Sequence, residues 1–386
     1  MGQTFQLFVA FSLPVALLGC SSDDDGDDTR LAAGSSQGGS SSAAGNSNHA
    51  GKSSTGGGGK AGSDGGSNSS GSSGSSGTGS SAAGSSAAGS SGVPGNPGEV
   101  GGCKMFPAED DWNLDISGMS VDASWTTKVQ ALVGGAKIHP DYGVDGRDLY
   151  GIPLNVVPEN QPKVPVIFDD YEDESDPGPY PFPGPDDVLI EGNRPESCDG
   201  DCHLLVVQSG ACQLYEGYAC EHRQDGWHCA NGAKWDLNEV GYGQREVGWT
   251  SADAAGLAIA PGLLRYDEVR AGEVTHALRF TLDCTTNAYV KPATHQAVPG
   301  GCDPSDGPPM GTRVRLKADY DVSKLSQSAQ VVLDGMKKYG MILADNGSNF
   351  YFQGEANAGW TEDDIEPLKG VPASAFEVVT MPPLMP

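Results

Sequence analysis

The stretch RYDEVRAGEVTHALRF, residues 265–280, runs into residues that favour β-structure and continue to Leu282. Successive side chains of a strand point to opposite faces of the sheet. One face of a strand over residues 274–282 would carry Val274, His276, Leu278, Phe280 and Leu282, and the other Thr275, Ala277, Arg279 and Thr281. The alternation predicts a strand of a β-rich fold that has His276 on its apolar face.

Residues 265–272 precede this strand and predict a short capped turn. Asp267 could cap that turn, or it could face a cleft together with Glu268. A histidine on an apolar face must find a partner or stay neutral, so His276 is either a satisfied core residue or a site residue facing a pocket. The sequence leaves open whether His276 and the two acids reach one cavity.

Other short runs of β-forming residues alternate with Pro and Gly, at residues 164–168, 203–208, 212–220 and 312–318. Residues 341–344 and 349–352 add two more such runs. Asn346-Gly347 lies between them and can supply the positive φ that a tight turn needs, so the sequence predicts a hairpin here.

Two helices are predicted from apolar residues at helical spacing. The first covers residues 125–133 after a cap at Asp122, and the second covers residues 329–339 after Ser326. Many short strands with only two short helices indicate a mainly β fold, which we expect to be a single sandwich or related antiparallel domain.

The chain has nine cysteines, and setting Cys20 aside leaves an even number in the folded region. In an exported chain eight cysteines most simply form four disulfides. We expect Cys284 to pair with Cys302, and the five cysteines of residues 198–229 to pair with each other and with Cys103. Zinc bound by Cys198, Cys202 and His203 is the rival interpretation.

The first twenty residues resemble bacterial lipoprotein signals. An apolar run over residues 5–18 leads directly into Gly19-Cys20, so that the junction reads Leu17-Leu18-Gly19-Cys20. No Lys or Arg precedes the run. The resemblance predicts removal of residues 1–19 and a lipid on Cys20. The mature protein would then be exported and held at a bacterial membrane, facing the periplasm or the cell exterior.

Residues 31–102 consist mainly of Gly, Ser and Ala and contain no aromatic residue. Such a segment cannot bury enough apolar surface to fold. We expect residues 20–102 to be a disordered tether with a reach of roughly 45 to 50 Å for its Gly/Ser part. The folded domain would cover residues 103–386.

The chain carries 23 basic and 51 acidic residues, a net charge of −28. Nucleic-acid binding needs clustered Lys and Arg, so this charge argues against it. Partners are expected to be neutral or cationic. The HExxH and GxxxxGK[ST] signatures are absent, no Rossmann GxGxxG follows a predicted strand, and the folded region has no GxSxG.

What remains is carboxylates and histidines near aromatic residues, which is typical of a glycan-cleaving site that uses two carboxyl groups. The candidate catalytic residues are Asp267, Glu268, His276, Asp253, Asp201 and His203. The candidate substrate-binding residues are Tyr266, Trp249, Arg279, His295 and Asp345. Structural alternatives are a capping box of Thr250 and Asp253, and a turn role for Asp345.

Three further patterns have alternative interpretations. The acidic run at residues 169–176 is either a solvated loop or a calcium site. The three histidines with Asp201 could bind a metal, although they are far apart in the sequence. Arg313, Arg315 and Lys317 alternate along one strand face and are either internally ion-paired or a seat for an acidic sugar.

Several phrases resemble a group of secreted proteins from myxobacteria and actinobacteria: residues 173–183, 248–257, 263–269, 276–281 and 338–352. The resemblance implies a single exported domain and assigns no catalytic residue. Two functions remain. One is a tethered enzyme that cleaves extracellular polysaccharide by hydrolysis or elimination. The other is a non-catalytic surface module that binds glycan or protein.

Overall fold

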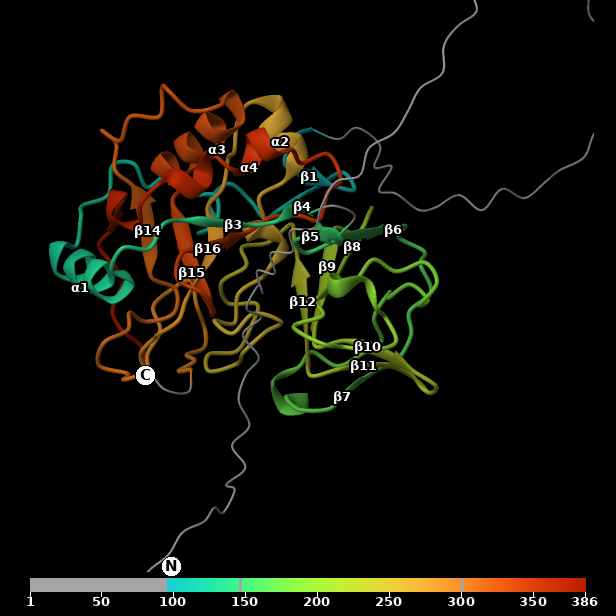
Figure 1. The fold of residues 1–386 in the computed structure, drawn as a ribbon. Coiled ribbons are helices and arrows are strands. Elements are labelled where there is room, and N and C mark those ends of the chain that lie inside the picture. The colour runs from blue at the N-terminus through green and yellow to red at the C-terminus, as the bar shows by residue number, and fades with distance from the viewer. Residues whose placement is uncertain (1–95, 146–147, 300–301) are drawn as a thin grey trace, which may run out of the picture. The chain divides into compact units, whose positions relative to one another are not determined.

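A computed structural model describes residues 96–386 except 146–147 and 300–301 (Figure 1). The expected signal peptide, the lipidation of Cys20 and most of the expected tether lie outside the described residues. The first described strands are β1 (Glu99–Val100) and its antiparallel partner β2 (Cys103–Lys104). Within the described residues, the helices are too short or too polar to cross a membrane.

The larger sheet has six strands in the order β17-β14-β15-β13-β16-β3. Their bounds are Phe376–Val378, Arg313–Leu316, Met341–Asn346, Leu278–Leu282, Tyr351–Gln353 and His139–Asp141. Strand β13 lies inside this sheet, parallel to β15 and antiparallel to β16. All five of its residues are buried, so the expected polar face of this strand, with Arg279 on it, faces the interior.

The smaller sheet has four strands in the order β12-β9-β8-β6, which cover Asn231–Asp236, Gln213–Tyr218, Leu204–Gln208 and Leu154–Val157. A three-stranded sheet contains β10 (Glu221–Arg223), β11 (Gly226–Cys229) and β7 (Val166–Phe168). Strands β4 (Gly143–Asp145) and β5 (Asp148–Tyr150) form a separate pair. The prediction of a mainly β, disulfide-joined fold is confirmed, with parallel pairs in all three larger sheets.

Both predicted helices are present. Asp122 caps α1 (Ala123–Val133) by accepting a hydrogen bond from the Trp125 amide, and Ser326 caps α3 (Gln327–Lys338). Two shorter helices, α2 (Tyr266–Ala271) and α4 (Glu362–Ile365), lie beside α3 at the top of Figure 1. Within the described residues there are also five 3-10 turns: Glu172–Glu174, Glu191–Asn193, Ala260–Gly262, Leu368–Gly370 and Ala373–Ala375.

The predicted hairpin at Asn346-Gly347 is wrong. Strand β13 is inserted between β15 and β16, so these two strands pair with β13 and not with each other. The connecting turn instead packs on the end of β13, where the Gly347 and Phe350 amides donate to the carbonyls of Leu282 and Thr281. The positive φ of this turn is at Phe350, at 59°.

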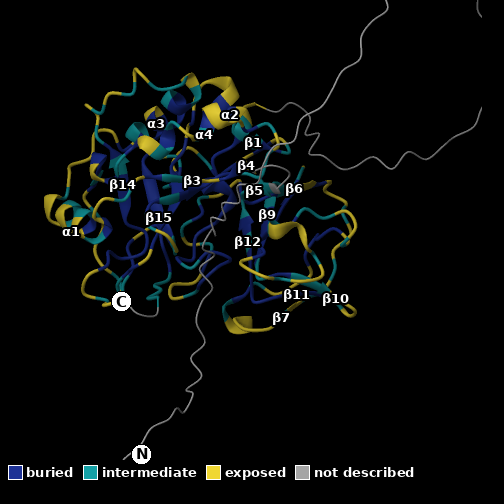
Figure 2. Cartoon of the chain, viewed as in Figure 1, coloured by how far each residue is buried: buried dark blue, intermediate teal, exposed yellow. Residues whose placement is uncertain are grey.

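One hydrophobic core joins the two sheets. It contains β13 residues such as Phe280 together with Leu205 and Val207 of the smaller sheet. The alternate residues of β8, Leu204 and Val206, enter a second core against the three-stranded sheet. Strand β8 is therefore buried on both faces, and Figure 2 shows this buried interior continuing from one sheet to the other.

Four disulfides are formed: Cys103–Cys212, Cys198–Cys202, Cys220–Cys229 and Cys284–Cys302. Both expectations for the cysteines are confirmed, namely the Cys284–Cys302 bond and the closed set around residues 198–229 with Cys103. The zinc interpretation is wrong because Cys198 and Cys202 are bonded to each other.

Candidate functional site

The guanidinium of Arg279 on β13 is the centre of a buried cluster of charged side chains. Its Nε and Nη2 donate to the two carboxylate oxygens of Asp253, at 3.2 and 3.0 Å. Its Nη2 also lies 3.5 Å from Oδ2 of Asp345. Arg279 and Asp253 are buried, at 2% and 0% exposed. Two parallel N–H···O bonds of this kind fix the orientation of both groups.

A β-bulge in β15 places Asp345 in this cluster. Phe280 of β13 pairs with Leu343, but the next residue, Thr281, pairs with Asp345, so Ala344 is the extra residue. Asp345 therefore lies beside Thr281, on the face that also carries Arg279. The Ala344 carbonyl accepts the Ala255 amide at 2.9 Å and so holds the loop that contains Asp253.

Polar residues continue across the same face of the larger sheet. Since Phe280 pairs with Phe352 in antiparallel register, Gln353 of β16 lies opposite Arg279. Gln353 in turn pairs with Asp141 of β3, and its Nε2 donates to Asp141 Oδ2 at 3.4 Å. Asp345, Arg279, Gln353 and Asp141 thus form a row across four neighbouring strands.

The smaller sheet contributes His203, which directly precedes β8. Its Nδ1 lies 2.6 Å from Oε2 of Glu191, and its Nε2 lies 3.2 Å from the carbonyl oxygen of Ala252. Both ring nitrogens therefore face acceptors, the arrangement of an imidazolium. Burial acts to lower the pKa of His203, but the Glu191 carboxylate outweighs it and raises that pKa to about 9.

Asp345 differs from its neighbours because its side chain remains 27% exposed. Burial and the negative charges of Asp253 and Asp201 raise the pKa of Asp345 to about 7, despite the opposing charge of Arg279. At neutral pH the carboxyl group is therefore about half protonated. A titratable group with a strongly shifted pKa beside buried charges is a marker of functional sites.

Tyr218 of β9 lies within range of the charges of Asp345 and Asp201. Burial, together with the charges of Asp201 and Asp345, raises the pKa of Tyr218 to about 12, so the phenol stays protonated. Its ring centroid is 5.8 Å from that of His203. Asp201 and Tyr171 are exposed beside it. A protonated phenol thus lies close enough to Asp345 for the charge of that carboxyl group to affect it.

The structure brings together five of the predicted site residues: Asp201, His203, Asp253, Arg279 and Asp345. The capping box expected at Asp253 is wrong, since no helix begins there and its carboxylate binds Arg279. Asp345 does accept the neighbouring Asn346 amide at 2.7 Å, but it does so within β15 and not in a hairpin turn.

A second predicted group forms a separate ion cluster in the core. Glu268 accepts from Arg265 Nη2 at 2.9 Å and lies 3.0 Å from Nε2 of His276. Burial would raise the pKa of Glu268, but these two partners lower it to about 2. His276 is therefore a satisfied core residue. Asp267 lies in the first turn of α2, whose N-cap is Arg265, so its expected capping role is wrong.

Two of the three remaining candidates, His295 and Trp249, support the loop that contains Asp253. His295 Nδ1 lies 2.9 Å from the carbonyl oxygen of Ala254, and the Trp249 carbonyl accepts from Thr294 Oγ1 at 2.9 Å. The third, Tyr266, packs edge-on against Trp360 near α2, with ring centroids 5.1 Å apart. Trp249 and His295 are thus positioned to hold the loop.

Glu216 of β9 fixes the other end of this loop and was not predicted. Its buried carboxylate accepts the amides of Ile259 and Ala260, each at 2.9 Å, and the indole N–H of Trp235 at 3.0 Å. A charged residue inside the apolar run of residues 212–220 was the available signal, because a buried charge requires partners. Glu191, Gln353 and Asp141 carried no comparable local signal.

The cations of strand Arg313–Leu316 are satisfied internally, whereas residues 169–173 of the acidic run are an exposed loop. Arg313 donates to the carbonyls of Asp111, Leu114 and Tyr339, and Arg315 pairs with Glu377. In the acidic run, Asp176 pairs with Arg245. Among the described residues, no group of three His, Cys, Asp or Glu is arranged to hold a metal ion, so neither the expected calcium site nor the histidine metal site has a ligand set there.

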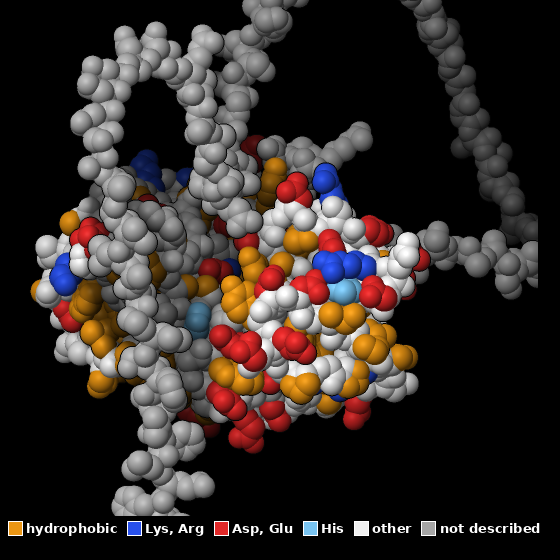
Figure 3. Space-filling view, turned by 90° about the horizontal axis from the view of Figure 1, so that it is seen from below, with side chains coloured by type: hydrophobic (Ala, Val, Ile, Leu, Met, Phe, Trp, Pro, Cys, Tyr) orange, Lys and Arg blue, Asp and Glu red, His pale blue; other side chains and the backbone are white. Residues whose placement is uncertain are grey.

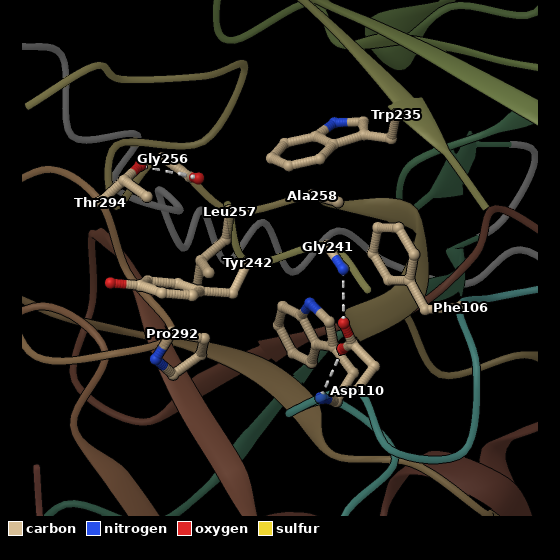
Figure 4. Close-up of a pocket in the computed structure, with 11 residues that line it drawn as sticks. Phe106, Asp110, Trp235, Gly241, Tyr242, Gly256, Leu257, Ala258, Pro292 and Thr294 are labelled. Atoms are coloured by element: carbon tan, nitrogen blue, oxygen red, sulfur yellow. Dashed lines mark hydrogen bonds between the residues drawn. The ribbon is translucent and has the colours of Figure 1, made fainter. Parts of the chain in front are cut away.

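An aromatic crevice lies beside the same loop (Figure 4). Phe106, Trp112, Trp235 and Tyr242 line it, together with Leu257 and Ala258. At its base Asp110 accepts the amides of Trp112 and Gly241, at 2.8 and 2.7 Å. Its free volume of about 10 Å³ suits one water molecule. We therefore assign this crevice to packing.

On the molecular face shown in Figure 3, carboxylates are interspersed with hydrophobic side chains and outnumber the cations.

Comparisons of the chain with family models, curated proteins and solved structures found no match.

Proposed function

We propose that the folded domain hydrolyses glycosidic bonds in an extracellular polysaccharide, with Asp345 as the general acid. The observation that carries this proposal is the partly exposed Asp345 carboxyl group, whose pKa is raised to about 7. A general acid is most effective when its pKa lies near the working pH. Arg279 and its partner Asp253, which lie on the buried side of Asp345, have no such access to solvent.

In the proposed reaction, Asp345 donates its proton to the glycosidic oxygen while the bond from that oxygen to the anomeric carbon breaks. A water molecule adds to the anomeric carbon, and its proton passes to the exposed carboxylate of Asp201. Asp253 and Arg279 are positioning residues, because they hold Asp345 from its buried side. Tyr218 is placed to donate a hydrogen bond to the bound sugar.

The alternative function, a non-catalytic binding module, would favour an exposed aromatic strip without paired acids. Four tryptophans of the described residues, Trp112, Trp227, Trp235 and Trp360, are instead buried. The acidic-sugar seat that elimination chemistry would need at Arg313 and Arg315 is also occupied by internal partners. These observations favour hydrolysis.

The proposed location follows from the lipoprotein-type signal. The domain would be held at a bacterial membrane by a lipid on Cys20 and would face the periplasm or cell exterior. Its tether would give it access to polymers beyond the membrane surface. This accounts for the combination of a disulfide-joined domain and a Gly/Ser-rich segment in one chain.

The test is a panel of polysaccharides incubated with the full-length exported protein, with assays for new reducing ends and for unsaturated products. We expect reducing ends only. Asp345→Asn should lower turnover by about 10²-fold or more without lowering the melting temperature. Asp319→Asn is the matched control, because Asp319 is exposed in the segment that connects β14 to α3.

Three results would contradict the proposal. Asp345→Asn could retain full turnover, unsaturated ends could appear in place of reducing ends, or glycans could be retained without any turnover. The last result would identify a binding module.

A further inference from the structure

Gln353 has a buried amide oxygen without a partner. The residue is 7% exposed, and no described residue lies within hydrogen-bonding distance of its Oε1. Its Nε2 donates to Asp141, which fixes the orientation of the amide. A buried acceptor left unsatisfied costs about 1–3 kcal/mol, so such an atom is expected to meet a donor in some state of the protein.

The position of Gln353 points to a donor from the substrate. Its register in β16 places it opposite Arg279 and beside Asp141, in the polar row that ends at Asp345. Asp141 is exposed, and the charges of Glu191 and Arg279 are near enough to act on its carboxyl group. Asp141 therefore lies within the same charged cluster. The unpartnered oxygen therefore belongs to the candidate site and not to a distant part of the core.

Among the described residues, the charges that solvent can reach in this region are negative. Asp141 and Asp201 are exposed, and the side chains of Glu191 and Asp345 are 30% and 27% exposed. The two cations, Arg279 and His203, are buried and already engaged by carboxylates. A ligand group that enters here meets acceptors and negative charge, with few free donors.

We propose that Gln353 and Asp141 form a subsite for the protonated amino group of an amino sugar, next to the general acid Asp345. An ammonium group has three donors and no acceptor, which matches an unpartnered amide oxygen beside a carboxylate. A sugar hydroxyl would also require donors, and the Gln353 Nε2 and the Arg279 Nε are already used. This inference rests on the proposed function and names its substrate class.

The proposed subsite should also select against acidic sugars. A uronate would place its carboxylate beside Asp141 and Glu191, where the described residues offer no free cation to receive it, and like charges in close contact are unfavourable. An N-acetylated sugar would lose the positive charge and add bulk at the same position. The expected order of affinity is therefore amino sugar, then N-acetylated sugar, then uronate.

The test measures binding and turnover separately, with the full-length exported protein. Oligomers of glucosamine, N-acetylglucosamine and galacturonic acid of equal length are titrated by calorimetry and then assayed for new reducing ends. We expect the glucosamine oligomer to bind most tightly. Gln353→Met, which keeps the size but removes the acceptor, should weaken that binding about tenfold and leave the N-acetylglucosamine affinity unchanged.

Asp141→Asn provides a second variant in case Gln353→Met is unstable, because Asp141 is exposed and the Oδ1 of an asparagine can still accept the hydrogen bond from Gln353 Nε2. It should also weaken glucosamine binding about tenfold, an effect that added salt reduces. Asp319→Asn should bind all three oligomers as the unchanged protein does.

Failure of the subsite and failure of the proposed function give different results. Tight glucosamine binding without turnover would retain the subsite and overturn the enzymatic function. Turnover of N-acetylglucosamine or galacturonic acid oligomers with equal or greater affinity would overturn the subsite and retain the function. Equal losses for all three oligomers in both variants would likewise overturn the subsite, since they would indicate a structural role.

Discussion

At the scale of single residues, the raised pKa of Asp345 has a consequence for stability. Its folded-state pKa of about 7 lies above the value of 3.8 for an ordinary aspartate. Between these two pH values the folded state binds more protons than the unfolded state, so its stability falls as the pH rises. Above about pH 7 the charged carboxylate remains a constant cost to the folded protein.

Asp345→Asn should therefore stabilise the protein at pH 8 and have little effect on its stability at pH 4. A shift of about three pH units corresponds to about 4 kcal/mol, and the partial exposure of the side chain reduces the expected gain to about 1–2 kcal/mol. Thermal unfolding of both proteins across this pH range measures it. Equal melting temperatures at pH 8 would show that the carboxyl group is not strained when ionised.

The activity of the unchanged protein should follow the same group. Because the general acid must be protonated, kcat should fall about tenfold per pH unit above about pH 7. A pH–rate profile on the preferred polymer measures this. A plateau that extends to pH 9 would assign the acid role to a different residue.

The sequence could predict individual members of the site but not their grouping. Asp253, Arg279 and Asp345 were identified because ionisable residues stood out among apolar and aromatic neighbours. His276 and Glu268 had the same local signature, yet they meet in a core ion cluster. The pattern reports that a buried charge needs a partner. The pattern does not indicate whether that partner lies in a core or beside solvent.

At the scale of elements, local signals predicted the helices and failed for the hairpin. The caps at Asp122 and Ser326 act within one turn, so the sequence around them contains the whole interaction. The separation of β15 from β16 depends on β13, more than fifty residues earlier in the chain. The bulge at Ala344, which places Asp345, depends on the same long-range pairing.

The loop that contains Asp253 is held at one end by Ala344 and at the other by Glu216. Glu216→Gln replaces one acceptor oxygen by an NH2 group that faces an N–H donor in either orientation, the Trp235 indole or the backbone amides, so it should destabilise the protein by about 2–4 kcal/mol. It should also lower kcat, because the loop positions Asp253 against Arg279. Thermal unfolding and turnover measure the two effects, and Glu159→Gln, at an exposed glutamate, is the control.

An unchanged melting temperature for Glu216→Gln would contradict this assignment. It would mean that the amides of Ile259 and Ala260 find other acceptors and that the loop is held from the Ala344 side alone.

At the scale of the whole molecule, two disulfides close loops of very different length. Cys103–Cys212 joins residues 109 positions apart and links the first strands to the smaller sheet, while Cys198–Cys202 spans four positions directly before His203. The entropic cost of closing a loop grows with its length. The long bond should therefore act mainly on global stability, and the short bond on the local geometry of Asp201 and His203.

Paired Cys→Ser variants separate these roles. Removing Cys103–Cys212 should lower the free energy of unfolding by about 4–5 kcal/mol, and removing Cys198–Cys202 by about 2 kcal/mol. The second change should nevertheless reduce turnover more at a temperature where both variants are folded, because Asp201 lies within the short loop and His203 follows it. Denaturant unfolding and kcat, measured on the same preparations, give both quantities. If turnover instead followed stability in both variants, the residues 198–202 would serve only as a structural loop, and the proton acceptor would have to be sought among the other exposed carboxylates of the site, Asp141 and Glu191.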